Sequence, residues 1–415
     1  MKILQFHEKA SFFGGGEAYF FDLCRALIRK GINIVCMHVS NSHYLETVNL
    51  GLKAYFIPAC FGLRRGARTA TRVIDIIKKE NPDIVHFHGI YYKVSPLIVR
   101  IVNHIKPTII TIHEILNFCF KNSKLLPSNE ICPFFAGWHC FHRCNLSERS
   151  KINYLKLLIF HYWKQFEYKR LDKIIVPSRY IYEELLRNKF PCHKLELLPH
   201  YLPICHQWTR SENNTFNDND EKIILYIGRL TRGKGILVFL KALSLITDLP
   251  WKAIIIGDGE EMTQIKYYLS KKNLARRVLL IGQLLRKNLQ NYYKKSTVVV
   301  MPSLFPETFG FVGLEAMYFK RPVVAFNAGG ISEWLIHEKN GFLIERGNIR
   351  MLAYYIRLLL ENKEICQRFG KEGYRIVRER FSRERHIEKL LNIYEDVLNA
   401  RQKTGHKERH FFGWK

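Results

Sequence analysis

The sequence contains two series of short apolar segments that alternate with amphipathic helical segments, and a polar stretch separates the two series. The apolar segments of the first series are KILQFH, NIVCMHV, KAYFIP, DIVHFHG and TIITIHE. Those of the second series are KIILYIGRL, KAIIIGDG, RVLLIGQ, TVVVMPS, RPVVAFN and GFLIE. Strands that alternate with helices predict a parallel, doubly wound sheet. We therefore expect two α/β domains that face each other across a cleft, because ligands of such sheets bind beyond the carboxyl ends of the strands.

The polar stretch sets the expected domain boundaries. Residues 206–221 (HQWTRSENNTFNDNDE) are rich in Asn, Asp and Ser and are predicted to link an N-terminal domain, residues 1–205, to a C-terminal domain, residues 222–382. A helix over residues 383–401 carries one apolar stripe and is expected to pack back on the N-terminal domain. The basic, aromatic tail, residues 402–415, is either frayed or in contact with a membrane.

The chain is strongly basic, with 65 Lys and Arg against 37 Asp and Glu and a formal net charge of +28. The excess is spread over both halves and favours anionic partners: nucleic acid, acidic lipid surfaces or phosphorylated substrates. A well-solvated surface would account equally for any single basic run. We find no known RNA- or DNA-binding module, so we expect an enzyme and no nucleic-acid partner, and keep a basic nucleic-acid-binding protein as an alternative.

The sequence predicts a cytoplasmic protein. The opening MKILQFHEKASFFGGG is not typical of a secretory signal, and no apolar run approaches the ~18 residues of a membrane span. Basic residues at helical spacing on the first domain, and the apolar and basic segment 151–173, either contact anionic lipid head groups at the inner face of the cytoplasmic membrane or form solvated helix faces. The basic residues are Arg64, Arg65, Arg68 and Arg72.

Two glycine-rich turns are candidate phosphate sites. YIGRLTRGKG, residues 226–235, ends a strand and places Arg229 and Lys234 around a turn, which suits a diphosphate or simply forms a solvated basic turn. GGGEAY, residues 14–19, lies between the first strand and the first helix, where backbone amides can approach an anion at a helix N-terminus. A tight structural turn is the alternative for this second segment.

The segment FPETFGFVGLEAM, residues 305–317, carries two carboxylates beside a predicted helix start. Glu307 is expected in the loop after the strand TVVVMPS, and Glu315 about two turns into the helix. Backbone amides near Phe309 and Gly310 would face a phosphate, and the carboxylates would accept hydrogen bonds from hydroxyl groups on either side. Hydroxyl groups on both sides of a diphosphate describe a nucleotide sugar.

Together these motifs resemble those of glycosyltransferase family 4, whose members are retaining enzymes of the two-Rossmann (GT-B) fold. The second half contributes GRL…KG, GDG, MPSLFPETFGFVGLEAM and RPVVAFNAGGISEW…NGFLI, and the first half contributes GGGEAY, TIHE and IIVPSRY. The similarity spans about residues 1–400. It implies a GT-B architecture, in which two Rossmann-like domains face each other across a cleft.

The resemblance also implies roles for individual residues. Arg229 and Lys234 would hold the donor diphosphate, Glu307 the sugar and Glu315 the ribose hydroxyls. The backbone at Phe309 and Gly310 would lie beside sugar and phosphate, Gly15 and Gly16 would form a loop over donor and acceptor, and His113 would face the transferred sugar. Two positions depart from the family pattern, Lys320 where Gly is common and Glu114 where Asp is usual. The change at Lys320 concerns the end of a helix more than the chemistry.

The function implied by the resemblance is transfer of a sugar from a UDP- or GDP-sugar to a glycan or lipid-linked acceptor, as in lipopolysaccharide, O-antigen or capsule assembly. The sugar would leave and be attacked on the same face, and the departing diphosphate would take the acceptor proton. Arg229, Lys234 and a helix N-terminus would stabilise the developing charge, so no divalent metal or other cofactor is expected in the chemistry. A nucleotide-sugar epimerase or hydrolase of the same fold is the alternative.

Four cysteines cluster in the segment 117–146, which we interpret as a Cys-rich insertion. They are Cys119, Cys132, Cys140 and Cys144. Thiols so close together in a reducing compartment are typical of a structural zinc site, and His139 or His142 could replace one of them as a ligand. The spacing is irregular, so ordinary loop and core thiols are the alternative. Any zinc here would be structural.

Overall fold

The computed structural model describes residues 1–8, 14–39, 51–60, 62–90, 93–144, 151–204, 208 and 221–403. The chain divides into two compact units. The first unit comprises Met1–Asn122, Pro133–Pro199 and Arg383–Lys415, and the second comprises Ser123–Cys132 and His200–Ser382. No helix in the described part is long and apolar enough to span a bilayer.

The described part of the first unit contains a seven-stranded parallel sheet in the order β3-β2-β1-β4-β5-β6-β7. Its strands are β1 (Lys2–His7), β2 (Asn33–His38), β3 (Lys53–Phe56), β4 (Ile84–His88), β5 (Thr108–Thr111), β6 (Lys173–Val176) and β7 (Leu195–Leu197). β1 pairs with β2 on one side and with β4 on the other. The strand order therefore changes direction between β1 and β4, which is the switch point where ligands bind in such sheets.

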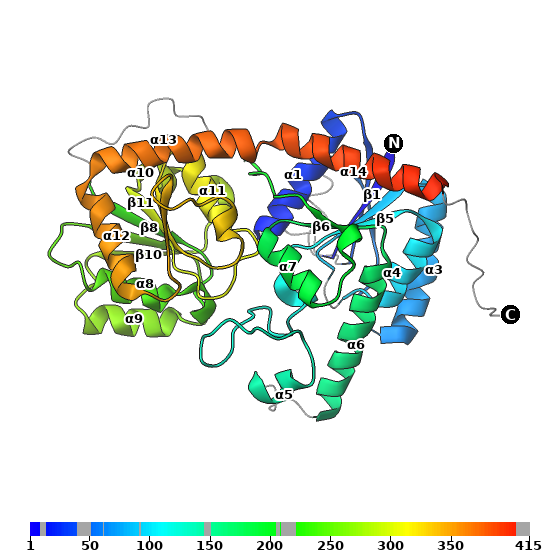
Figure 1. Ribbon diagram of the computed structural model, residues 1–415, viewed down its shortest axis with the longest axis horizontal. Coiled ribbons are helices and arrows are strands. Elements are labelled where there is room, and N and C mark those ends of the chain that lie inside the picture. The colour runs from blue at the N-terminus through cyan, green and yellow to red at the C-terminus, as the bar shows by residue number, and fades with distance from the viewer. Residues whose placement is uncertain are drawn as a thin grey trace. The chain divides into compact units, whose positions relative to one another are not determined.

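Helices cover both faces of this sheet. They are α1 (Gly15–Arg29), α3 (Gly62–Glu80), α4 (Pro96–Ile105), α6 (Lys151–Arg170), α7 (Arg179–Arg187) and α14 (Arg383–Lys403). The short helix α5 (His139–Arg143) lies near the far end of α6, away from the sheet (Figure 1). Figure 1 shows α1 and α14 on one face and α3, α4 and α6 on the other. Because both faces are covered, the central strands β4 (IVHFH) and β5 (TIIT) are buried throughout, including their histidine and threonine side chains.

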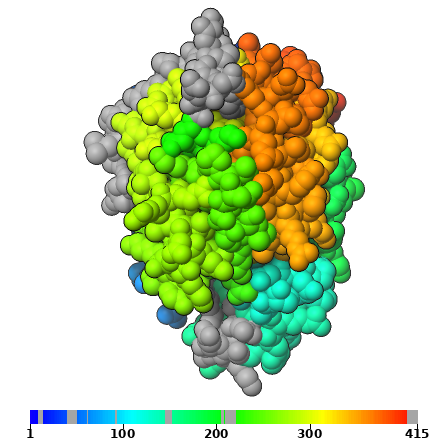
Figure 2. All heavy atoms as spheres, turned by 90° about the vertical axis from the view of Figure 1, so that its left-hand side faces the viewer, coloured from blue at the N-terminus to red at the C-terminus, as the bar shows by residue number. Residues whose placement is uncertain are grey.

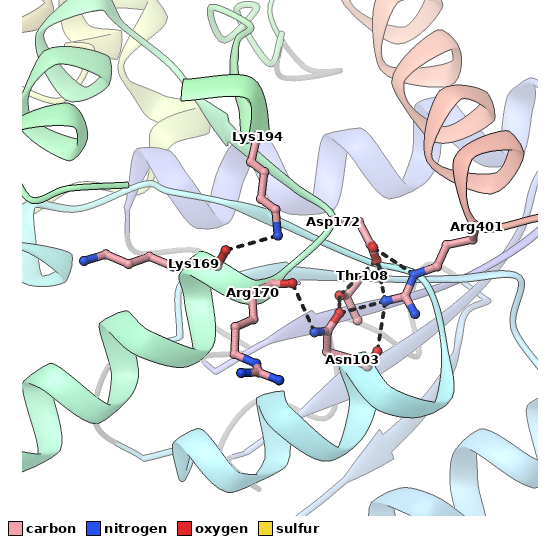
Figure 3. A network of polar contacts seen from close by, with 7 residues as sticks. All are labelled: Asn103, Thr108, Lys169, Arg170, Asp172, Lys194 and Arg401. Atoms are coloured by element: carbon pink, nitrogen blue, oxygen red, sulfur yellow. Dashed lines mark hydrogen bonds and ion pairs between the residues drawn. The ribbon is translucent and has the colours of Figure 1, made fainter. Parts of the chain in front are cut away.

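The C-terminal helix α14 is fastened to the first unit by a polar network at its last turn (Figure 3). Arg401 donates from Nε and Nη2 to the two carboxylate oxygens of Asp172, at 2.8 and 2.9 Å. Its Nη2 also lies 2.9 Å from both the backbone and the side-chain oxygen of Asn103. Thr108 completes the network, because its backbone N–H donates to Asp172 Oδ2 at 2.7 Å.

The second unit contains, among its described residues, a six-stranded parallel sheet in the order β10-β9-β8-β11-β12-β13. Its strands are β8 (Ile223–Ile227), β9 (Lys252–Ile256), β10 (Val278–Gly282), β11 (Val298–Met301), β12 (Val323–Phe326) and β13 (Gly341–Ile344). Its helices are α8 (Ile236–Leu243), α9 (Met262–Lys271), α10 (Gln290–Lys295), α11 (Phe311–Tyr318), α12 (Ile349–Glu361) and α13 (Lys363–Arg380). The switch point lies between β8 and β11. Figure 2 shows the outer face of this unit, where α8 and α9 (green to lime) and α12 (orange) lie side by side.

The prediction of two parallel, doubly wound α/β domains is confirmed. The two units differ from the expected domain boundaries in two ways. The division lies between Pro199 and His200, and the segment Ser123–Cys132 belongs to the second unit although it was expected in the first domain. Most of the expected linker lies outside the described residues. One described residue of it, Trp208, is not linker-like, because it is buried in the core of the second unit.

Candidate donor-phosphate site

The loops that follow β8 and β11 lie against each other at the switch point of the second unit. The backbone N–H groups of Leu304 and Phe305 both donate to the Gly233 carbonyl, at 2.8 and 3.1 Å. Gly235 has a positive φ of 71°, and a Cβ placed there would lie 1.8 Å from the Pro302 oxygen. Only glycine fits so close to the neighbouring backbone, so these turns bring Lys234 next to the loop that carries Glu307.

Lys234, Glu307 and Ser303 form the centre of the site. Lys234 Nζ lies 2.7 Å from Glu307 Oε1, and Ser303 Oγ donates to the same oxygen at 2.5 Å. The Glu307 side chain is buried, and its backbone is held as well, because Gly330 N–H donates to the Glu307 carbonyl at 2.7 Å. An ammonium group carries three donors. Two of those on Lys234 can therefore serve an anion while the third keeps the bond to Glu307.

Arg229 lies in the same turn but is differently placed. Its side chain is exposed, and in the described part of the chain it forms no ion pair. Its backbone is fixed, because Tyr226 Oη and Thr231 N–H both donate to the Arg229 carbonyl, at 3.1 and 3.0 Å. The turn thus presents one guanidinium without a carboxylate partner and one ammonium that is held by Glu307. Such a pair of cations suits a phosphate or diphosphate.

Glu315 belongs to a separate hydrogen-bonded cluster. Its Oε1 accepts from Arg286 Nε and its Oε2 from Tyr293 Oη, both at 2.7 Å. The Arg286 guanidinium lies 4.7 Å from the ring centroid of Trp208, and its Nη2 is buried with no hydrogen-bond partner in the described structure. Each carboxylate oxygen has two lone pairs, so Glu315 can still accept a hydroxyl hydrogen. Glu315 is the fifth residue of α11, just over one turn into the helix, so the expectation of two turns was wrong.

The start of α11 is formed by Phe309 and Gly310. Gly310 is the N-cap residue, with a left-handed backbone (φ 90°, ψ 64°). The Phe309 side chain is buried in the core, and its carbonyl accepts from Trp334 Nε1 at 2.6 Å. A Cβ at Gly313 would lie 1.9 Å from the Trp334 ring. Trp334 therefore fixes the backbone at the helix start, and Phe309 and Gly310 can offer only main-chain groups to a ligand.

In the first unit, His113 follows β5 and lies beside the turn before α1. A Cβ placed at Gly16 would lie 3.7 Å from His113 Cβ, whereas Gly15 is exposed at the first position of α1. His113 is buried, its Nε2 lies 3.0 Å from His88 Nδ1, and burial lowers its pKa to about 3. His113 is therefore a neutral imidazole at physiological pH.

The four cysteines of the expected insertion fall into different units. Cys119, Cys140 and Cys144 belong to the first unit and Cys132 to the second. Cys140 and Cys144 hydrogen-bond through their side chains, and this bond, together with burial, raises the pKa of the Cys140 thiol. Within the described ranges, no group of three or more His, Cys, Asp or Glu side chains could hold a metal ion. The structural zinc site stays a prediction without geometric support.

Sequence reasoning missed several partners of the predicted residues. Ser303 contacts Glu307 and lies in the quoted motif MPSLFPETFGFVGLEAM, but no pattern in the sequence assigned it a role. The other partners belong to the Glu315 cluster and lie in none of the quoted motifs; they are Arg286, Tyr293 and Trp208. Trp334 could have been found, because it ends the conspicuous segment GGISEW. Trp208 stood out in the sequence only as a large aromatic residue inside the polar stretch 206–221.

Comparisons with known proteins agree with this geometry. The family model described as "Glycosyl transferases group 1" matches residues 209–376, and that described as "Glycosyltransferase Family 4" matches residues 13–202. Of the solved structures, the Anabaena protein HepE in complex with UDP has a TM-score of 0.72 at 18% identity, and the match covers 95% of this chain and 100% of that one. At this identity the likeness shows the fold alone, which is GT-B.

Two curated relatives illustrate the sequence similarity. An uncharacterised glycosyltransferase of Methanocaldococcus jannaschii is 28% identical over 226 residues, which are 54% of this chain and 60% of the relative. The poly(ribitol-phosphate) alpha-N-acetylglucosaminyltransferase of Staphylococcus aureus is 34% identical over 177 residues, 42% of this chain and 35% of the relative. The matches thus span only about a third to three fifths of these relatives' length.

The two parallel α/β units, each with a switch point in its sheet, define the chain as a protein of the GT-B fold. The two family models cover, between them, most of both units. The chain is therefore a glycosyltransferase of the family 4 type.

Proposed function

We propose that the protein transfers a sugar, with retention of configuration, from a nucleotide diphosphate sugar to a glycan acceptor. The observation that carries this proposal is the turn after β8, in which Lys234 is held by Glu307 while Arg229 is exposed with no ion pair among the described residues. In this proposal the two cations bind the diphosphate, and Glu307 contacts the sugar while it orients Lys234. Glu315 accepts the ribose hydroxyls, and the unpartnered Nη2 of Arg286 is a donor at the same cluster.

The proposed reaction breaks the bond between the anomeric carbon and the diphosphate oxygen. The electron pair of this bond stays on the diphosphate, where Arg229 and Lys234 stabilise the added negative charge. An acceptor hydroxyl then attacks the anomeric carbon on the face from which the diphosphate leaves. Its proton passes to a diphosphate oxygen, so no protein carboxylate has to act as nucleophile or base. His113 and the turn at Gly15 and Gly16 face the sugar in this arrangement.

The two cations supply the charge that a divalent metal supplies in other transferases, so we propose a reaction that needs no metal. Activity in excess chelator should equal activity without it. A strict requirement for magnesium would contradict the proposal. If chelation instead lowers the melting temperature together with activity, a structural metal is present.

The donor is proposed to be a UDP- or GDP-sugar, a choice supported by the UDP bound to the Anabaena relative of the same fold. Thermal shift with UDP-, GDP- and ADP-sugars, followed by product analysis with and without glycan acceptors, tests the proposed function. We expect stabilisation by one donor class and an α-linked product. Release of free sugar alone, or an epimerised donor without any acceptor product, would identify a hydrolase or an epimerase instead.

We further propose that the acceptor is lipid-linked, in cell-envelope polysaccharide synthesis such as lipopolysaccharide or capsule, and that the protein acts peripherally at an anionic membrane. The support is the exposed face of α6, on which large apolar residues recur at spacings of three and four. They are Ile152, Leu155, Ile159, Tyr162 and Phe166. Ile152, Ile159 and Phe166 are each more than half exposed (67%, 59% and 54%), which is unusual for a helix of a globular unit.

The charges on this face favour an anionic surface. Lys156 and Arg170 are exposed on it, and Arg170 lies 5.3 Å from the ring centroid of Phe166. The acid of α6, Glu167, is buried and accepts from Trp163 Nε1 at 3.2 Å. Figure 1 shows α6 running beside α4 and continuing beyond it toward α5. An apolar face with cations and aromatic rings is typical of helices that lie in the lipid head-group region.

A further inference from the structure

The segment Ser123–Cys132 forms a small hairpin that is part of the second unit. Leu125 and Ile131 form an antiparallel bridge, and the backbone N–H of Leu126 donates to the Glu130 carbonyl at 3.0 Å. The hairpin therefore has two short arms and a turn of three residues between them.

The turn of this hairpin follows from its sequence. Its three residues are Pro127, Ser128 and Asn129. Three-residue hairpin turns commonly end in a residue with a left-handed backbone, and Asn129 has this conformation (φ 69°), which asparagine tolerates well. The Asn129 N–H closes the turn by donating to the Leu126 carbonyl at 3.0 Å. The carbonyls of the turn therefore have fixed directions.

Arg346 connects the turn of the hairpin to the loop that carries Glu307. Its Nη1 lies 2.5 Å from the Asn129 carbonyl oxygen and 3.1 Å from the Leu304 carbonyl oxygen. This nitrogen carries two hydrogens, so it can donate to both carbonyls at once. Arg346 is 217 residues from Asn129 and 42 residues from Leu304, so the contact exists only in the folded unit.

The loop at Leu304 is also tied to the turn that carries Lys234. The Leu304 N–H donates to the carbonyl of Gly233, the residue before Lys234, at 2.8 Å. Ser303, the residue before Leu304, donates to the Glu307 carboxylate. Leu304 thus lies between the two charged groups of the candidate site, and its own carbonyl is the one that the guanidinium holds. A shift of Leu304 would move Glu307 relative to Lys234.

An apolar contact supports the polar one. Leu125 packs against an apolar core cluster of the second unit, and Leu304 belongs to the same cluster. A second hydrogen bond, from Arg232 Nη2 to the Pro127 carbonyl, is long at 3.4 Å and comes from an exposed side chain, so it adds little. The hairpin is therefore held by the core at its arms and by Arg346 at its turn.

We propose that Arg346 is a positioning residue of the donor-phosphate site, and that the hairpin Ser123–Cys132 is the support against which it holds Leu304. The guanidinium fixes the loop that carries Glu307 before any ligand binds, so the diphosphate does not have to arrange Lys234 and Glu307. Such preorganisation raises affinity, because less ordering is required on binding. The part that concerns the diphosphate rests on the proposed function, whereas the holding of the loop does not.

The first test needs no ligand and measures hydrogen exchange of the full chain. Residues 302 and 306 are prolines, so the segment 302–306 has only three amides, and those of Leu304 and Phe305 donate to the Gly233 carbonyl. Arg346→Met keeps an apolar stem but removes the donors, and should raise the exchange rate of this segment roughly tenfold. Arg346→Lys keeps three donors on one nitrogen and should exchange like the unmodified chain.

Arg350→Met is the matched control, because it removes an exposed arginine four residues further along with the same loss of charge, and should change nothing. Melting curves show which variants are folded. Unchanged exchange in folded Arg346→Met would overturn the proposal. An equal increase in Arg350→Met would overturn it as well, because the loss of charge would then explain the effect.

The hairpin is tested by replacing its three turn residues with Asn-Gly, which closes a hairpin by a two-residue turn and removes the Asn129 carbonyl. This variant keeps Arg346 and the net charge, and it should raise the exchange rate of segment 302–306. Combined with Arg346→Met it should cause no increase beyond that of Arg346→Met alone, because the hairpin is proposed to act through Arg346. Additive effects would overturn the role of the hairpin.

Binding of a nucleoside diphosphate tests the role toward the donor. With UDP as the probe, or GDP if thermal shift selects it, the Kd of Arg346→Met should be roughly tenfold higher than that of the unmodified chain. Arg346→Lys and Arg350→Met should keep the unmodified Kd. An unchanged Kd in an Arg346→Met chain with faster exchange would overturn the positioning of the diphosphate site. If the unmodified chain binds neither nucleotide, the proposed function is contradicted instead, and the exchange rates still decide whether Arg346 holds the loop.

Discussion

At the scale of single residues, the candidate site depends on how differently its two cations are held. Lys234 is bound to a buried carboxylate, Glu307, whereas Arg229 is exposed and forms no ion pair among the described residues. Glu307 neutralises part of the Lys234 charge but fixes its position. Arg229 carries its full charge and is the more available group for a doubly negative diphosphate.

Replacing Arg229 with Ala should lower kcat/KM for the nucleotide sugar about 10²-fold, because a cation that stabilises the leaving diphosphate is lost. Steady-state kinetics with the donor found by thermal shift measures this. Arg232→Ala is the control, since Arg232 is an exposed arginine of the same turn whose Nη2 bonds to the Pro127 carbonyl. If Arg229→Ala and Arg232→Ala lower kcat/KM equally, the overall positive charge of the turn matters and the position of Arg229 does not.

Glu80 at the end of α3 provides a pH prediction. Burial opposes its ionisation, but hydrogen bonds from Lys53, Tyr55 and Lys2 outweigh burial and lower the pKa of Glu80 from 4.5 to about 2. The folded-state pKa is depressed, so this contribution is present above pH 4.5 and is lost as the pH falls toward 2.

Between these pH values the unmodified chain should lose about 2 kcal/mol more stability than Glu80→Gln. Urea unfolding at a series of pH values measures the difference, and parallel pH profiles of the two chains would refute the assignment.

At the scale of elements, the end of α11 explains the departure from the family pattern at Lys320. Lys320 follows the helix with a left-handed backbone (φ 58°), which side chains other than glycine adopt at a cost. Its ammonium lies 5.5 Å from the ring centroid of Tyr374, and its carbonyl lies against Gly370 of α13. The cap geometry is therefore retained with lysine in the position where glycine is easier.

Lys320→Gly should stabilise the second unit by about 0.5–1 kcal/mol, because the strained φ is relieved. Thermal or urea unfolding measures the change. Lys295→Gly makes the same replacement at a helical position, the last residue of α10, and should destabilise by a similar amount. If Lys320→Gly also lowers the stability, the contact between the Lys320 ammonium and the Tyr374 ring contributes more than the strained backbone of Lys320 costs.

The helix α14 is anchored at its far end by Arg401 (Figure 3). Arg401→Ala should lower the free energy of unfolding by about 2–3 kcal/mol, because Asp172 and Asn103 lose charge-assisted hydrogen bonds. Lys389→Ala removes the same charge from the exposed face of α14 and should change stability by less than about 0.5 kcal/mol. Equal effects in the two variants would show that the network adds nothing beyond its charge.

At the scale of the whole molecule, the proposed membrane contact combines the net charge of +28 with the apolar face of α6. In this proposal the charge attracts the protein to an anionic surface over about a Debye length, and the apolar face holds it there. We expect neither feature alone to give stable attachment.

The protein should float with vesicles that contain phosphatidylglycerol, but not with pure phosphatidylcholine, and high salt should weaken the association. The double variant Ile159→Asp and Phe166→Asp should abolish flotation, whereas Tyr267→Asp, at an exposed apolar residue of α9 in the second unit, should not. Failure of the unmodified chain to float would remove the membrane proposal. A dimer that the double variant dissociates would show that a second copy covers this face.

Much of the site could be predicted because its residues lie in short motifs. Gly235 has a positive φ and lies against the Pro302 backbone, so a glycine in this segment marks the turn that carries Lys234. The partners could not be predicted in the same way. Arg286 lies in the segment after β10 and Glu315 in α11, 29 residues apart, and only the tertiary fold of the second unit brings them together.

The sequence by itself determined the two sheets, their parallel strands and the position of the cation-bearing turn, because strand periodicity and glycine-dependent turns are local properties. Only the tertiary structure decided that Lys234 pairs with Glu307, that Trp208 is buried and that Tyr394 of the C-terminal helix hydrogen-bonds Gln5 of the first strand. The physical reason is that a buried polar group must be satisfied by whatever donor or acceptor the fold places beside it, and no local pattern records that neighbour.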